Sequence, residues 1–220
     1  MHAEFRQEEV LELWFPDSGH QATNESHAAF WQERMQGGMD ARICERFADV
    51  TLAAVRGGLD HWAENPYGRL ALILVLDQFS RSLWRDRPEA FGQDIKATRL
   101  ALEGIENGHY AALKNAWEKQ FYLIAILHCE GPDHLARSEW AVAMNEELVE
   151  KDALPHLDRY KELELAVAQS KRMRDVIACF GRHSHRNPIL GRVSTPEEED
   201  YIAGGDFPHV QKGPPARDSA

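Results

Sequence analysis

The amino-acid sequence predicts an all-helical protein folded as one domain. Apolar residues recur at spacings of three and four along most of the 220-residue chain, and the strict alternation typical of strands does not recur. Helix-starting and helix-ending residues bracket these periodic stretches. Because no linker divides the chain, we expect a single all-helical domain over 1–203 and a flexible C-terminal tail over 204–220, which is rich in Gly, Pro and charge.

The first two helices indicated by this pattern span about 40–56 and 65–84. In 40–56, Asp40 is a candidate N-cap, and apolar residues follow it at threes and fours. In 65–84, Asn65 can cap the helix and Pro66 can occupy its first position. The run after Pro66 is apolar on all sides, so we expect this helix to lie at the centre of the fold.

The same spacing predicts further helices downstream. Their expected ranges are about 88–108, 117–128, 133–151, 156–180 and a short helix that begins after 195. In the last of these, the hydroxyl of Thr195 can accept from the third backbone amide, while Glu198 can reach back to the start of the helix. Gly181 ends the long helix before it.

Composition and charge exclude several classes of protein. Apolar residues make up 43% of the chain and charged residues 28%, as in ordinary globular proteins. The net charge of −11 argues against a nucleic-acid or anionic-membrane partner, because binding to phosphates requires Lys and Arg. The longest apolar run, LALILVL, is far shorter than the roughly 20 residues that span a bilayer.

Cysteine usage and the N-terminus indicate a compartment. The three cysteines form no C-x-x-C pair and are odd in number, which argues against a disulfide framework or a structural zinc site. The first residues are acidic, whereas a signal peptide needs a basic region followed by an apolar one. We therefore expect a cytoplasmic protein, and nothing in the sequence calls for a cofactor.

Three segments concentrate chemically active side chains. They are LDQFSRSLWR at 76–85, LHCE at 127–130 and CFGRHSHRNPILGRVST at 179–195. Together they resemble the bacterial domain-of-unknown-function family 924, and the similarity extends over most of the chain. The resemblance implies an all-helical fold similar to tetratricopeptide-like superhelices or bundles, with about eight to ten helices. It implies no established activity.

The resemblance also marks individual positions. Those that match the family pattern are Asp77, Gln78, Arg81, Arg85, His128, Glu130, Arg182, His185, Arg186, Asn187 and Arg192. The chain departs from the pattern at Ser82, Gly131 and His183–Ser184. These departures fall in or directly after the three segments, so they weaken any claim that needs the full family constellation.

The matched cations need anions near them. Asp77, Arg81 and Arg85 are spaced by four, which places them on one stripe of a helix. Arg binds carboxylate or phosphate through two parallel hydrogen bonds, and converging Arg side chains would otherwise repel each other. In a purely structural interpretation, protein carboxylates supply the anions, and the resulting ion pairs hold the segment 181–195 against the helices. The candidate carboxylates are Asp77, Glu130 and Asp133.

A functional interpretation starts from the excess of cations. Five Arg and two His in the three segments face two matched carboxylates, which leaves positive charge for a small phosphate or carboxylate ligand. The expected ligand-binding residues are Asp77, Gln78, Arg81, Arg85, Arg182, Arg186, Asn187 and Arg192. If the site is catalytic, the candidates are His128 or His185 for proton transfer and Glu130 for orientation.

Other interpretations remain open at this stage. A helical superhelix can serve as a scaffold for a protein partner. A metal-dependent hydrolase would use His128, Glu130, His134, His183 and His185, although no H-E-x-x-H motif is present. A Cys129 or Cys179 nucleophile is disfavoured, since sequence neighbours on a helix point apart. Convergence of guanidinium groups with uncompensated charge would favour the ligand pocket, and a carboxylate locked on each would favour the scaffold.

Overall fold

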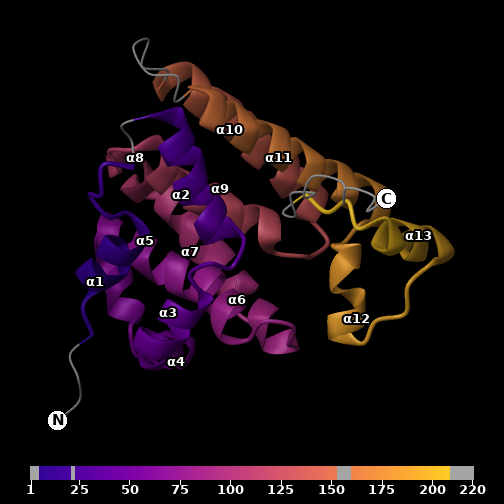
Figure 1. Ribbon diagram of the computed structural model, residues 1–220, viewed down its shortest axis with the longest axis horizontal. Coiled ribbons are helices and arrows are strands. Elements are labelled where there is room, and N and C mark those ends of the chain that lie inside the picture. Colours follow the sequence, from indigo (N-terminus) through magenta and orange to yellow (C-terminus); the bar gives the residue numbers. More distant parts are fainter. Residues whose placement is uncertain (1–4, 21–22, 153–159, 209–220) are drawn as a thin grey trace, which may run out of the picture.

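The fold consists of helices, and the residues that the structure describes contain no strand (Figure 1). The structure is a computed structural model, and it describes residues 5–20, 23–152 and 160–208. The helices are α1 (Gln7–Trp14), α2 (Asn24–Met35), α3 (Asp40–Arg46), α4 (Ala48–Val55), α5 (Pro66–Leu74), α6 (Ser80–Leu83), α7 (Asp94–Glu106), α8 (His109–Ala112), α9 (Ala116–His128), α10 (His134–Asp152), α11 (Tyr160–Phe180), α12 (Asn187–Leu190) and α13 (Pro196–Gly204). The all-helical prediction is confirmed.

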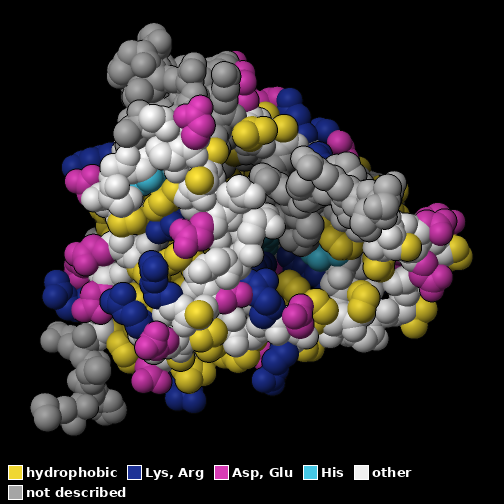
Figure 2. Space-filling view, viewed as in Figure 1, with side chains coloured by type: hydrophobic (Ala, Val, Ile, Leu, Met, Phe, Trp, Pro, Cys, Tyr) yellow, Lys and Arg dark blue, Asp and Glu magenta, His cyan; other side chains and the backbone are white. Residues whose placement is uncertain are grey.

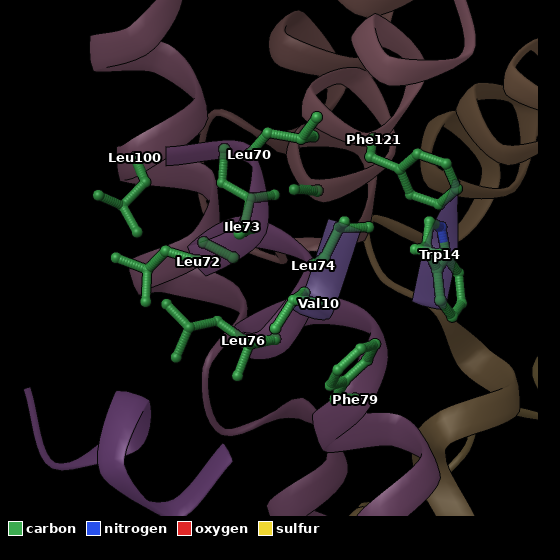
Figure 3. Close-up of a cluster of buried hydrophobic side chains, with 14 of the residues drawn as sticks. Val10, Trp14, Leu70, Leu72, Ile73, Leu74, Leu76, Phe79, Leu100 and Phe121 are labelled. Carbon is green, nitrogen blue, oxygen red and sulfur yellow. The ribbon is translucent and has the colours of Figure 1, made fainter. Parts of the chain in front are cut away.

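Helix α5 is the centre of the hydrophobic core, as its apolar sequence predicts. Every side chain from Gly68 to Leu74 is buried, and the helix packs against α1, α7, α8 and α9. Figure 3 shows Leu70, Ile73 and Leu74 of α5 among side chains from these neighbours. Burial of each such aliphatic side chain stabilises the fold by about 1.5–3 kcal/mol. The core therefore fixes the position of α5 and of the buried segment Val75–Phe79 that continues it.

Helices α10 and α11 lie side by side along one edge of the molecule, and α9 packs against α10 (Figure 1). Helix α13 lies at the end of α11, at the right of Figure 1, and α12 lies below it. After α13, Asp206 pairs with Arg172 at 2.9 Å and the ring of Phe207 lies 5.2 Å from that of His185. Residues 204–208 thus contact the body, whereas the rest of the expected tail, 209–220, and the 153–159 stretch lie outside the described residues.

Two expected helices are interrupted. The helix expected at 40–56 breaks at Phe47, where φ is −123° and ψ is 10°, into α3 and α4. Asp40 is the first residue of α3 rather than its N-cap, and its carboxylate pairs with Arg85. The helix expected at 88–108 begins as a 3-10 turn, Pro88–Phe91, and becomes α-helical only at Asp94.

The helix expected at 65–84 contains a π-helical turn at Val75–Phe79. There the amide of Ser80 donates to the carbonyl of Val75, five residues back instead of four. Such turns are rare, and they occur frequently at functional sites. This one contains the LDQF motif and places the side chain of Asp77 in the protein interior.

Local start signals are confirmed. Asn65 accepts from the amide of Gly68 at 2.8 Å, and Pro66 occupies the first turn of α5. Thr195 and Glu198 form the predicted capping box at the start of α13. Both signals depend on residues within one turn of each other, so tertiary packing does not override them.

Candidate functional site

The end of α9 is held in place by side chains from other segments. The last carbonyls of a helix lack intrahelical partners. Here they accept from four side chains: Thr98 to Ala125 (2.7 Å), Arg137 to Ile126 (2.9 Å), and His134 and His183 both to Leu127 (2.9 and 3.0 Å). Burial lowers the pKa of both imidazoles, so each is neutral and donates through Nε2–H. These contacts fix the position of His128, the last residue of the helix.

Asp77 lies beneath His128 and orients it. Its side chain is 1% exposed, accepts from Nδ1 of His128 at 2.8 Å and from Gln78 at 2.5 Å, and forms an ion pair with Arg81 at 3.0 Å. Burial raises the pKa of Asp77, but Arg81 and His128 outweigh it and hold the pKa well below its usual range. The ionised carboxylate can only accept, so the proton of neutral His128 is on Nδ1.

His128 is therefore arranged as a base. Burial lowers its pKa, although Asp77 opposes this shift, so the imidazole is neutral near pH 7. Its side chain is 15% exposed, and among the described residues Nε2 has no hydrogen-bond partner. A buried carboxylate on Nδ1 with an open lone pair on Nε2 is the geometry of a general base.

Two guanidinium groups share one carboxylate beside this pair. Asp94, at the start of α7, accepts from Nη2 of Arg81 and from Nη1 of Arg186, each at 2.9 Å. Both guanidinium groups lie over the ring of Phe91, at 5.7 Å for Arg81 and 4.5 Å for Arg186. We call Asp77, Arg81, Asp94, His128 and Arg186 the inner cluster.

Charges balance in the inner cluster, but hydrogen-bond donors do not. Two guanidinium groups face two carboxylates, and His128 is neutral. Arg186 is 4% exposed, and its Nε is buried without an acceptor among the described residues. Burial lowers the pKa of Arg186, because Asp94 compensates only part of the lost hydration. The described residues therefore leave one donor of this buried guanidinium unpaired, which is costly.

The other matched Arg side chains form separate ion pairs, which we call the outer pairs. They are Arg85 with Asp40, Arg182 with Glu198, and Arg192 with Glu130. In each, two guanidinium nitrogens bond the two carboxylate oxygens. The expected stripe of Asp77, Arg81 and Arg85 is not formed, because α6 ends at Leu83 and the backbone turns at Trp84.

Several predicted roles change accordingly. Glu130 accepts from Arg192 and from the amide of His183, so it holds 183–192 in place instead of orienting a catalytic imidazole. The ring of His185 lies against those of His183 and Phe207. Asp77 and Glu130 pair with Arg residues of the three segments, whereas Asp133 pairs with Arg137, four residues along the chain.

Of the eight expected ligand-binding residues, the structure brings four together: Asp77, Gln78, Arg81 and Arg186. Asn187 is buried and donates to Ser194 at 3.0 Å, within its own segment. Sequence reasoning missed Asp94 and Phe91, which belong to none of the three motifs. The excess of Arg over carboxylate in those motifs was the signal that further acidic residues had to be nearby.

The donor geometry does not favour a metal centre. In the part of the chain that the structure describes, no three His, Cys, Asp or Glu side chains are grouped to hold a metal ion. His134 and His183 both donate to one carbonyl, and His128 donates to Asp77.

A separate cavity of about 440 Å³ lies at the outer pair of Arg182 and Glu198. Its lining residues are Cys179, Phe180, Arg182, Thr195, Glu197 and Glu198.

Comparisons with known proteins agree with this fold. A solved structure of a protein of unknown function from Agrobacterium tumefaciens is similar, with 29% sequence identity and a TM-score of 0.69 over 90% of this chain and 97% of that one. No curated protein matches the chain. None of the described helices is long and apolar enough to cross a membrane. The model of a family described as bacterial protein of unknown function (DUF924) matches residues 10–206, and the chain belongs to that family.

Proposed function

We propose that the chain binds a small anion at the inner cluster. Figure 2 shows a hollow between the helical body and the α12–α13 end of the molecule, with Lys or Arg and His side chains inside it. Arg81 and His128 are 19% and 15% exposed, so solvent reaches the edge of the cluster. A carboxylate or phosphate oxygen is the acceptor that this set of donors recognises.

The observation that carries the proposal is the state of Arg186. Its guanidinium is almost fully buried, it shares Asp94 with Arg81, and its Nε lacks an acceptor among the described residues. A buried charged donor without an acceptor costs more than about 1–3 kcal/mol, so a bound anion would offset that cost. His128 is joined to the same cluster through Asp77 and Arg81, so we propose that its Nε2 also faces the anion.

The outer pairs limit the proposal to the inner cluster. Arg85, Arg182 and Arg192 each have their own carboxylate, and by the criterion set from the sequence these three act as structural clasps. Arg182 and Arg192 hold the irregular segment that carries Arg186. The pocket hypothesis therefore needs one guanidinium from this segment rather than three.

A thermal-shift titration with acetate, phosphate and succinate tests this function. A ligand at 100 times its Kd stabilises the folded chain by about 2.7 kcal/mol, which raises the Tm of a chain of this size by roughly 5–10 °C. Arg186→Lys keeps a positive charge for Asp94 but removes the Nε donor, so we expect the ligand response to weaken at least tenfold. Arg85→Gln, at an outer pair, is the matched control and should respond like the wild type.

Two results of this titration would refute the proposal. If none of the three anions changes the Tm, the inner cluster is a structural clasp like the outer pairs. If Arg186→Lys and Arg85→Gln weaken the response equally, the anion binds elsewhere. A folded far-ultraviolet circular dichroism spectrum for each variant shows that a lost response is not lost structure.

A cytoplasmic setting is part of this proposal. Cys44, Cys129 and Cys179 are all free thiols, which supports a reducing compartment. Identical ligand responses with and without a thiol reductant are expected, because no cysteine belongs to the inner cluster. Loss of the response on reduction would show that the active form contains a disulfide.

A further inference from the structure

The inner cluster carries no net charge before a ligand enters. Arg81 and Arg186 are matched by Asp77 and Asp94, and the neighbouring Glu130 is matched by Arg192. A bound anion would therefore place an uncompensated negative charge in a mostly buried site. Such a charge is costly unless a counter-charge appears with it.

His128 is the group that can supply this counter-charge. Its Nδ1–H is already committed to Asp77, so in the free protein Nε2 carries a lone pair. A lone pair repels an anion, whereas an Nε2–H would donate to it. Protonation converts the imidazole into a cation that donates to Asp77 on one side and to the ligand on the other.

The groups that face His128 come from several elements. Asp77 and Arg81 face it from the π-helical turn and α6, Asp94 from α7, and His183 from the segment after α11. Arg186 lies against Asp94 in the same cluster. Their charges cancel and His183 is neutral, so the free site does not by itself favour imidazolium. The added anion is what changes the balance.

Resting on the anion site proposed above, we infer that the ligand is a monoanion of the monocarboxylate class and that His128 takes up one proton when it binds. In this step an N–H bond forms at Nε2 and the ligand remains a carboxylate, so the complex has the composition of protein plus neutral carboxylic acid. The positive imidazolium cancels a single negative charge. A dianion would leave one negative charge buried in the site even after this protonation.

Isothermal titration calorimetry at pH 6.5, in two buffers with different ionisation enthalpies, measures the proton count. Acetate is the monoanion and sulfate is the dianion. We expect acetate binding to take up more than about half a proton, and its Kd to rise as the pH is raised, by up to about tenfold per unit. Sulfate should bind at least tenfold more weakly than acetate.

Two variants separate this inference from the function on which it rests. His128→Gln can still donate to acetate but cannot titrate, so acetate binding should persist without proton uptake and without pH dependence. Arg85→Gln should behave as the wild type. If His128→Gln does not fold, the imidazole resonances of wild-type His128 provide the second measurement: its pKa should rise when acetate is added.

The possible outcomes are distinct. Acetate binding with no proton uptake overturns the inference and leaves the anion site intact, as does sulfate that binds as tightly as acetate. An unchanged His128 pKa in saturating acetate also overturns it. If acetate, sulfate and phosphate all fail to bind, the proposed function fails and this inference fails with it.

Discussion

The inner cluster and the outer pairs use the same side chains in different ways. In each outer pair, a guanidinium bonds both oxygens of its own carboxylate, and Arg85 is half-exposed. In the inner cluster, the buried Arg186 and the partly exposed Arg81 share Asp94, and Nε of Arg186 lacks an acceptor among the described residues. Nε of Arg192 also lacks an acceptor among the described residues, so incomplete pairing alone does not separate the two regions. The inner cluster differs in the deep burial of Arg186 and in the sharing of one carboxylate by two Arg side chains.

Asp94→Asn is expected to lower the free energy of unfolding more than any other substitution considered for the two regions. The substitution removes the shared negative charge and leaves Arg81 and Arg186 with Asp77 as the only inner carboxylate. Breaking a buried ion pair from one side costs about 3–5 kcal/mol, so the free energy of unfolding should fall by that amount in urea denaturation. A loss below about 1 kcal/mol would show that water hydrates the cluster as it does a surface pair.

Lowering the pH should weaken the contribution of the buried imidazoles to stability and leave that of the outer pairs unchanged. Burial lowers the pKa of His128, His134 and His183, so below about pH 6.5 the unfolded chain takes up protons that the folded chain does not. Stability therefore falls as the pH falls, and the slope for an imidazole that stays neutral in the folded chain approaches about 1.4 kcal/mol per pH unit. Arg182 lowers the pKa of Glu198, so this pair stays ionised in that range.

Urea unfolding at several pH values between 7 and 5 measures this loss. His183→Gln should flatten the dependence, since an amide can still donate to Leu127 but does not titrate. A wild-type stability that is constant over this range would mean that these imidazoles titrate with the same pKa in the folded and the unfolded chain.

The smallest effect is expected from Asp40→Asn, the isosteric counterpart of Asp94→Asn at an outer pair. The Arg85 side chain is 52% exposed, and exposed ion pairs contribute about 0–1 kcal/mol. Urea denaturation and the anion response should both remain close to those of the wild type. A loss comparable to that of Asp94→Asn would remove the distinction between the two regions.

Features set by neighbouring residues could be predicted from the sequence. The caps at Asn65 and Thr195 and the burial of α5 follow from residues within a turn or from a continuous apolar run. The breaks at Phe47 and at the π-helical turn could not be predicted, because the residues there also fit a regular helix. Only packing against the rest of the fold decides whether these residues form a regular or an interrupted helix.

The candidate site was predicted in part for the same reason. Its motifs identified Asp77, Arg81, His128 and Arg186, but the partner that joins two of them, Asp94, is 92 residues away from Arg186. A single sequence contains no signal for a contact at that separation. Glu130 bonds Arg192 and the amide of His183 and not His128, because closeness in sequence at a helix end does not imply contact between side chains.

The π-helical turn makes the geometry at Asp77 dependent on chain length as well as on residue identity. A wider turn accommodates one more residue than a regular helix, and each α-helical residue corresponds to a rotation of about 100°. Loss of a single residue anywhere in this turn would rotate the preceding helix, which the core holds, against the following one. The acid, its imidazole and its arginine could then all be retained in the sequence and still no longer meet.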